Sequence, residues 1–237
     1  MALCGDAALA LSFDVEAGAI AEHDQWHTQE HMPERLSIPG FLRGSRWTAE
    51  GRSPRYFVLY EVRDLAVLTG PDYLARLNAP TPWTTKMMPR YRGMRRGLCG
   101  VRASAGAGLG HALLTIHYAP AAGRARELHD WLARDALPAM AAQPGFACAH
   151  VLEAAAAAPM TSEQRIRGQD ETVRSVLVVT GYDAGFVDRV AEDGLSLERF
   201  ERHGAAPSPV QGKFRNDYTL TAVECQRPGS SAPDTAA

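Results

Sequence analysis

Three histidines, His23, His27 and His31, occur at every fourth position of a segment whose apolar residues have helical spacing. Residues four apart share a helix face, so the three imidazoles form one stripe. Imidazole changes charge near neutral pH and can take or give a proton, which suits general acid/base catalysis. His23 fits a solvated helix edge, His27 is an open case, and His31, close to Pro33, is the favoured catalytic residue.

The segment from His27 to His31 also reads His-x-x-Glu-His, with Glu30 before the second histidine. This pattern is found in one group of zinc metalloproteases. A site of that kind needs a third ligand downstream, and no second acidic motif in a helical context is evident. We therefore predict no metal at this motif.

Large aromatic and acidic side chains elsewhere are candidates for a pocket or its rim. Residues of these kinds are more often part of a core, because they bury a large apolar area. The candidate substrate-binding residues are Trp26, Glu30, Trp47, Tyr60, Glu61, Trp83 and Tyr118.

The segment that follows the histidines occurs twice in the chain. Residues 33–41 (PERLSIPGF) are matched 105 positions later by residues 138–146 (PAMAAQPGF). The same register places Leu128, Leu132 and Ala136 at the positions of the three histidines. One copy therefore uses this helix stripe for apolar contacts, and the other carries imidazoles there. The comparison assigns a functional site to the first half.

Each half has the order strand, helix, strand, strand, helix, strand, which is that of the split ferredoxin-like unit. In the first half we expect strands over 8–14, 41–49, 55–62 and 97–103, and helices over 18–31 and 71–78. In the second half we expect strands over 111–119, 146–153, 173–180 and 217–224, and helices over 125–137 and 184–202. Proline removes a helix donor, so the first helix should end before Pro33.

These elements predict an α+β fold of two tandem ferredoxin-like repeats, residues 1–105 and 106–226, with a disordered tail over 227–237. Helices cover one face of each sheet, so the two uncovered faces should pack together as an α/β barrel with an enclosed lumen. Residues 154–172 replace a turn of about six residues in the first half. A loop of that length is either a lid or a disordered insertion.

Strand alternation identifies a second candidate pair in the lumen. Leu9, Leu11 and Phe13 should face the helices, so Asp14 faces the lumen, as does His117 at the matching place in the second half. If the two side chains approached, the carboxylate would raise the proton affinity of the imidazole and fix its tautomer. The alternative is that both are hydrated at the mouth of the barrel.

Composition excludes several classes of protein. The chain has 237 residues, a net charge of −2 and 46% hydrophobic residues, so neither nucleic acid nor an anionic membrane is an expected partner. Four widely separated cysteines suggest neither a zinc ribbon nor a disulfide scaffold. No signal peptide or membrane-length apolar run is evident, and we expect a cytoplasmic protein.

The first half resembles the EthD-like proteins and the related dimeric α/β-barrel superfamily, here in a tandem-repeat form. The resemblance covers most of residues 8–103 and, more faintly, 111–224. Its most specific element is His31-Met32-Pro33 followed by Pro39-Gly40-Phe41; the weaker matches are residues 26–36, 56–61 and 81–84. The second half departs from the pattern, with Ala136 in place of the histidine.

The resemblance implies a lumen that binds small, mostly apolar molecules. Such proteins include cofactor-free cyclases, isomerases, lyases and monooxygenases, and also haem enzymes, so the fold does not choose the reaction. We expect a cofactor-independent cyclase, isomerase or lyase that moves a proton on an aromatic or polyketide-like carbonyl compound. His31 would be the acid/base, and the residues that would assist or orient it are Asp14, His27, Glu30, Tyr60 or His117.

Two alternatives stay open. One is an oxidoreductase of the same fold, either cofactor-free or with haem on a helix histidine. The other is a non-catalytic module that binds an apolar ligand. A homodimer is possible in each case.

Overall fold

The computed structural model describes residues 3–49, 51–155, 160–168 and 170–226. The predicted disordered tail, 227–237, lies outside the described residues, as do residues 156–159 and 169 of the predicted lid or insertion. The first half contains β1 (Ala7–Val15), η1 (Ala17–Ala19), α1 (Ile20–Trp26), η2 (His27–His31), α2 (Met32–Leu36), β2 (Phe41–Thr48), β3 (Tyr56–Val62), η3 (Leu65–Thr69), α3 (Pro71–Asn78), α4 (Pro82–Met87), η4 (Met88–Arg90) and β4 (Tyr91–Gly106).

The second half repeats this order, with additions around its third strand. Its elements are β5 (Ala112–Tyr118), α5 (Ala125–Trp131), η5 (Leu132–Ala136), α6 (Leu137–Ala141), β6 (Phe146–Ala154), α7 (Ser162–Arg167), β7 (Glu171–Thr172), β8 (Ser175–Gly181), α8 (Ala184–Arg189), η6 (Val190–Gly194), α9 (Leu197–Arg202), β9 (Val210–Thr221) and α10 (Ala222–Cys225).

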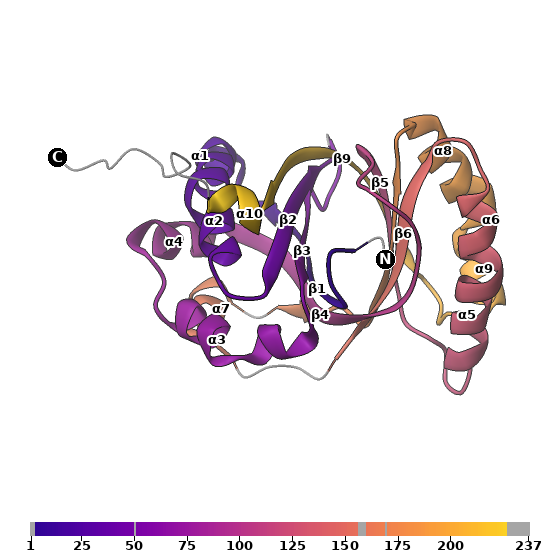
Figure 1. Ribbon diagram of the computed structural model, residues 1–237, viewed down its shortest axis with the longest axis horizontal. Helices are drawn as coiled ribbons and strands as arrows, with labels where there is room; N and C mark the ends of the chain where they lie inside the picture. Colours follow the sequence, from indigo (N-terminus) through magenta and orange to yellow (C-terminus); the bar gives the residue numbers. More distant parts are fainter. Residues whose placement is uncertain (1–2, 50, 156–159, 169, 227–237) are drawn as a thin grey trace.

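Eight strands form a closed antiparallel barrel, which confirms the predicted α+β fold. The strands follow the order β1, β3, β2, β9, β5, β8, β6, β4, and β4 pairs with β1 to close the ring. The two halves join through the pairs β2 with β9 and β4 with β6. Figure 1 shows α1 to α4 on one side of this barrel, together with α7 and α10, and α5, α6, α8 and α9 on the other.

The strands that join the halves differ from their predicted bounds. The strand predicted over 97–103 is β4, which begins at Tyr91 and ends at Gly106, and the one predicted over 217–224 is β9, which ends at Thr221. Arg95 and Arg96, which precede the predicted strand, pair with β1. Pairing with another strand gives these residues their extended conformation, because their own composition carries little strand propensity.

The first helix continues past Pro33 and ends at Leu36, so its predicted end was wrong. A π-helical turn, His27–His31, precedes the proline, and the N–H of Met32 donates to the carbonyl of His27 five residues back. This wider turn changes the local hydrogen-bond pattern just before the residue that lacks a donor. The second half has the same π-helical turn at Leu132–Ala136, before Pro138.

The barrel interior is packed with side chains, in contrast to the open lumen expected from the resemblance. Alternation along β1 is as predicted: Leu9 and Phe13 pack with the helices, whereas Ala10 lies in the interior. The largest interior side chains are Trp47, Phe57 and Phe214. A ligand therefore needs a place outside this interior, and the layer between helices and sheet is the next candidate.

Candidate functional site

All three stripe histidines are buried between the first helix and the outer face of the sheet. The expectation of a solvated edge for His23 was therefore wrong, because this side chain has no exposed surface. His23 Nδ1 lies 3.1 Å from Asp24 Oδ1, and its Nε2 lies 3.3 Å from the hydroxyl of Tyr91. Both ring nitrogens are thus used inside the protein, and His23 has a structural role.

His27 holds the hydroxyl of Tyr60. Arg46 Nη1 lies 3.4 Å from His27 Nδ1, and a guanidinium can only donate, so Nδ1 is the acceptor. The neutral ring then carries its proton on Nε2, which lies 3.3 Å from Tyr60 Oη and donates to it. Tyr60 accepts this bond and keeps its own O–H for another acceptor. His27 therefore positions a hydrogen-bond donor.

His31 differs from the other two histidines because its Nδ1 has no hydrogen-bond partner among the described residues. The nearest carboxylate oxygen, Glu34 Oε2, lies 3.9 Å away, which is too long for a hydrogen bond. The ring packs on Trp26 with a centroid distance of 4.3 Å. Trp26 therefore fixes the imidazole without using its nitrogen.

His31 and Tyr60 line a common pocket between the first helix and the sheet. The space in this pocket that water can occupy is about 30 Å³, enough for one or two water molecules. Its lining residues are Leu9, Leu11, His31, Arg35, Tyr60, Tyr73, Leu77, Arg96, Glu163, Gln164 and Arg167. Apolar walls with convergent polar groups are typical of small-molecule sites, but an organic ligand would need this pocket to open.

Helix α7, from the second half, covers this pocket. Arg35 Nη2 donates to both carboxylate oxygens of Glu163 at 2.5 Å. Ser162 also bonds to the side chain of Asn78 at the end of α3, and Arg167 pairs with Asp170. Figure 1 shows α7 beside α3, on the first half's side of the barrel. The insertion over 154–172 thus contributes a cover to the other repeat.

Burial and nearby cations keep His31 neutral at pH 7. Burial lowers the pKa of His31 well below its usual value of 6.5, and the charges of Arg35 and Arg167 lower it further. A neutral imidazole can accept a proton, and an anion formed beside it would raise its pKa again. The pocket therefore holds a base that gains strength as negative charge develops on a ligand.

Arg96 is the cation of this pocket with the fewest partners. Its Nη2 donates to the hydroxyl of Tyr73 at 3.3 Å, and within the described residues it has no carboxylate partner. The side chain is half-buried on β4 and points to the helix side of the sheet. Arg96 could therefore stabilise an anionic ligand.

Glu30, Trp26 and Trp83 serve the helix packing rather than the pocket. Glu30 accepts hydrogen bonds from Trp26 Nε1 at 3.1 Å and from the hydroxyl of Thr81 at 2.6 Å. Trp83 donates to Glu22 at 3.1 Å. Glu30 is thus directed toward α4. Among the described residues, no group of three or more His, Cys, Asp or Glu side chains is arranged to hold a metal ion.

Trp47 and Glu61 lie on the interior face of the barrel, away from the stripe. Glu61 has no exposed surface and accepts a hydrogen bond from Arg43 Nε at 2.7 Å. It follows Tyr60 directly on β3, so alternation sends the two side chains to opposite faces of the sheet. Only Tyr60 therefore shares the pocket with His31.

The structure does not bring Asp14 and His117 together. Asp14 accepts hydrogen bonds from the hydroxyl of Ser53 and, at 2.7 Å, from the backbone N–H of Arg55. The ring nitrogens of His117 have no hydrogen-bond partner among the described residues, and its ring lies near Phe57. The turn between β2 and β3 thus holds Asp14 and keeps it from acting on the imidazole.

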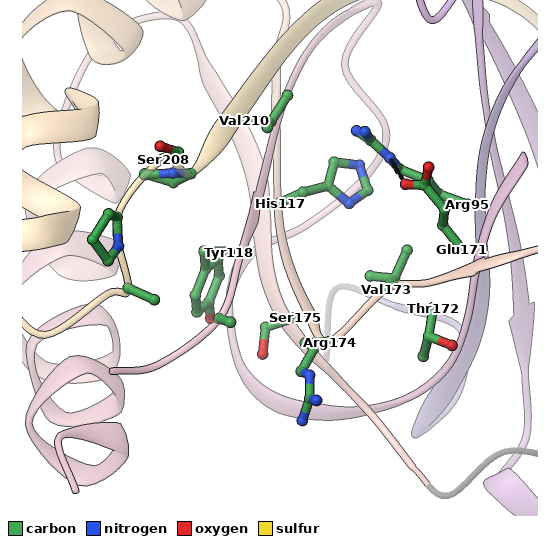
Figure 2. A pocket seen from close by; sticks show the side chains of 14 residues that line it. Arg95, His117, Tyr118, Glu171, Thr172, Val173, Arg174, Ser175, Ser208 and Val210 are labelled. Carbon is green, nitrogen blue, oxygen red and sulfur yellow. Dashed lines mark hydrogen bonds and ion pairs between the residues drawn. The ribbon is translucent and has the colours of Figure 1, made fainter. Parts of the chain in front are cut away.

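His117 instead borders a separate hollow at the end of the barrel. Figure 2 shows its ring directed toward Arg95, which forms an ion pair with Glu171 at 2.9 Å, while Tyr118 lies on the other side of the strand. Burial and the charge of Arg95 lower the pKa of His117 to about 4. The hollow contains about 630 Å³ of empty space, solvent included. It lies apart from the histidine stripe.

Sequence reasoning missed seven pocket residues: Arg35, Tyr73, Leu77, Arg96, Glu163, Gln164 and Arg167. Arg35 lies four residues after His31, at the right spacing for the same helix face, so it could have been found. Glu163 could not, because no pattern in the insertion tells which part of the molecule it covers.

Of three comparisons with known proteins, only the comparison with solved structures finds similar proteins. No family model matches the chain, and no curated protein matches it. The solved structure of an anthrone oxidase-like protein has a TM-score of 0.63 at 12% identity and covers 91% of this chain and 92% of its own. Putative monooxygenases from Fusobacterium nucleatum and Lactobacillus acidophilus have TM-scores of 0.60 and 0.57 at 7% and 10% identity, and each covers 92% of this chain and 96% or 97% of its own.

These likenesses concern the fold, since the identities are low. Within the described residues no helix combines the length and the apolar character needed to span a membrane. The TM-scores show that the chain shares its fold, a closed barrel of two ferredoxin-like halves, with these solved structures.

Proposed function

We propose that this protein is a small-molecule enzyme that moves a proton on an aromatic or polyketide-like carbonyl compound in the pocket at His31. The observation that carries the proposal is the buried, neutral imidazole of His31, whose Nδ1 has no hydrogen-bond partner in the described structure. Buried polar atoms without partners are uncommon and are often found where a ligand binds. His31 would be the general base and, after proton uptake, the general acid.

Two other side chains of the pocket suit the developing anion. The O–H of Tyr60, held by His27, can donate to an enolate or phenolate oxygen, and the guanidinium of Arg96 adds positive charge. Preorganised donors of this kind stabilise the transition state because they need no reorganisation. The reaction would be a cyclisation, isomerisation or elimination that begins with loss of a carbon-bound or phenolic proton.

Cofactor-free oxidation is the second candidate, because it can begin with the same deprotonation. The likeness of fold to an anthrone oxidase-like protein brings it into consideration. Oxygen uptake separates the two reactions, since proton transfer alone consumes none. Haem fits the helix stripe less well: His23 and His27 use both ring nitrogens inside the protein, so of these three histidines only His31 could ligate iron. A Soret band after haem titration would support that role.

The test uses a panel of phenols, anthrones and lactones in deuterated water. NMR measures deuterium incorporation at the acidic position, and an oxygen electrode measures uptake. We expect exchange with the wild-type protein and a loss of about 100-fold or more in His31→Gln, with circular dichroism unchanged. The control is His203→Gln, in the second half, where the ring stacks on Trp131. Wild-type exchange rates in His31→Gln would remove His31 from the mechanism.

Other parts of the proposal rest on the sequence. Kinship with the EthD-like proteins rests on the His31-Met32-Pro33 turn. A cytoplasmic location fits the four cysteines, which form no disulfide bond within the described residues. The proposed partner is a small aromatic substrate, and a homodimer is the oligomeric form to test.

A further inference from the structure

The pocket at His31 already contains a carboxylate, and it comes from the other repeat. Both oxygens of Glu163 lie 2.5 Å from Nη2 of Arg35, and the two side chains are 2% and 3% exposed, Arg35 first. Removing two charges from water is costly, and their attraction offsets that cost only with good geometry. Arg35 therefore offers a formed binding position for a carboxylate, inside a pocket that also has apolar walls.

The internal repeat shows that this arrangement is present in one half only. Glu163 lies in the long connection between β6 and β8, whereas in the first half a short turn joins β2 to β3. The position of Arg35 is occupied by Met140 in the second half. The guanidinium and the carboxylate that covers it thus occur together, on the side of the molecule that carries the histidines.

The remaining charges of the pocket also suit an anion. Arg35, Arg96 and Arg167 line it, whereas Glu163 is the only carboxylate among its lining residues. Arg167 is paired with Asp170 outside the lining, and Glu34 contacts Nη1 of Arg35 at 3.2 Å. Nη1 can therefore keep Glu34 while a different anion occupies Nη2.

We infer that the ligand of this pocket carries a carboxylate, which takes the place of Glu163 on Nη2 of Arg35 while α7 moves aside. The inference deepens the proposed function and rests on it only in using the same pocket. The closed pocket has room for only about 30 Å³ of water, so the displacement of α7 would also open the space for the aromatic body of the ligand, beside Leu11, Tyr73 and His31. Arg35 would thus determine specificity for aromatic acids over their neutral analogues.

Calorimetric titration with benzoate and benzamide tests this inference on the full chain. Wild-type protein should bind benzoate weakly, because the internal carboxylate must leave first. Glu163→Ala should bind benzoate at least tenfold more tightly and benzamide with little change. The matched control, Glu127→Ala, removes an exposed partner of Arg124 and should bind benzoate as the wild type does. Glu163→Gln keeps the size of the side chain and should behave as Glu163→Ala if that variant does not fold.

Hydrogen exchange gives a second readout on the wild-type protein. Saturating benzoate should speed amide exchange in α7, whereas benzamide should not. Equal benzoate affinities of the wild type and both Glu163 variants, or an equal gain for benzamide, would show that Glu163 is only a structural partner of Arg35. The two tests are independent, because benzoate binding is measured without turnover. A failed binding test would not affect the deuterium-exchange test of His31, and a failed exchange test would not affect the binding test.

Discussion

At the scale of single residues, the three histidines share one helix face but have three different environments. His23 and His27 are satisfied by neighbouring side chains, and only His31 retains a nitrogen without a partner. The sequence predicted the stripe because it depends on helical periodicity alone; it favoured His31 for its place beside Pro33, and the catalytic role of His31 stays a prediction. It could not predict the burial of His23, which depends on Tyr91 at the start of a distant strand.

Tyr60→Phe tests the oxyanion donor. The variant keeps the ring in the core and removes only the hydroxyl that His27 positions. We expect proton exchange to slow by about 100-fold, as for the loss of one preorganised donor. The comparison variant is Tyr56→Phe, whose hydroxyl donates to Asp24 away from the pocket. Unchanged rates in Tyr60→Phe would exclude the hydroxyl from the chemistry.

The pH dependence of proton exchange follows from the environment of His31. Its pKa lies well below 6.5 because of burial and nearby cations, and the base must be neutral to act. The rate should therefore be flat from about pH 6.5 to 8 and should fall only at lower pH, as the imidazole becomes protonated. A rate that falls by half near pH 6.5 would show an imidazole in contact with solvent.

Stability should also decrease in acid, and His150 allows a test away from the pocket. Burial lowers its pKa from 6.5 to about 4 in the folded protein. Between these pH values the unfolded chain binds more protons, so the free energy of unfolding falls as pH falls, by about 3 kcal/mol for this residue alone. Urea unfolding of His150→Gln should show a weaker pH dependence than the wild type. An identical dependence would mean that His150 stays solvated in the folded state.

At the scale of elements, turns and helix ends decide where the pocket residues lie. The tandem motif Pro-Gly-Phe predicted the turn into the second strand, and both copies have glycines with positive φ, 95° at Gly40 and 98° at Gly145. The passage of the helix through Pro33 was not predictable from propensity, because it depends on the π-helical turn before it. That turn keeps Arg35 on the same helix as His31.

Substitution of Gly40 tests the turn. A Cβ there would lie 2.5 Å from a methyl group of Val67, and the backbone has φ +95°, so Gly40→Ala should cost about 3 kcal/mol of stability. Gly51→Ala also has positive φ but meets no atom within 4 Å, and should cost about 1 kcal/mol. Urea unfolding compares the two. Equal losses would mean that the contact with Val67 relaxes freely.

At the scale of the whole molecule, each half needs the other to complete its sheet. The repeat and the order of elements predicted two ferredoxin-like units, but not that β4 and β9 each belong to both sheets or that α7 crosses to the first half. Those contacts link residues far apart in sequence, so no local pattern encodes them. The filled interior was missed for a related reason: its packing depends on side chains from both halves.

Separation of the halves tests this dependence. Residues 1–106 alone would leave β2 and β4 with unpaired edges and would expose the interior face. We expect the fragment to self-associate, and we expect co-expression with residues 107–237 to restore a one-to-one complex, as measured by size-exclusion chromatography with light scattering. A monomeric first half with native circular dichroism would contradict a shared core.

The central claim is that the ligand site lies between the helices and the sheet of the first half. A crystal structure of the protein with an aromatic carbonyl compound that it exchanges is the most direct measurement. We predict density for the compound between β1 and the first helix, with a polar atom within hydrogen-bond distance of His31. Density in the barrel interior, in the hollow at His117 or against the helices of the second half would contradict the account.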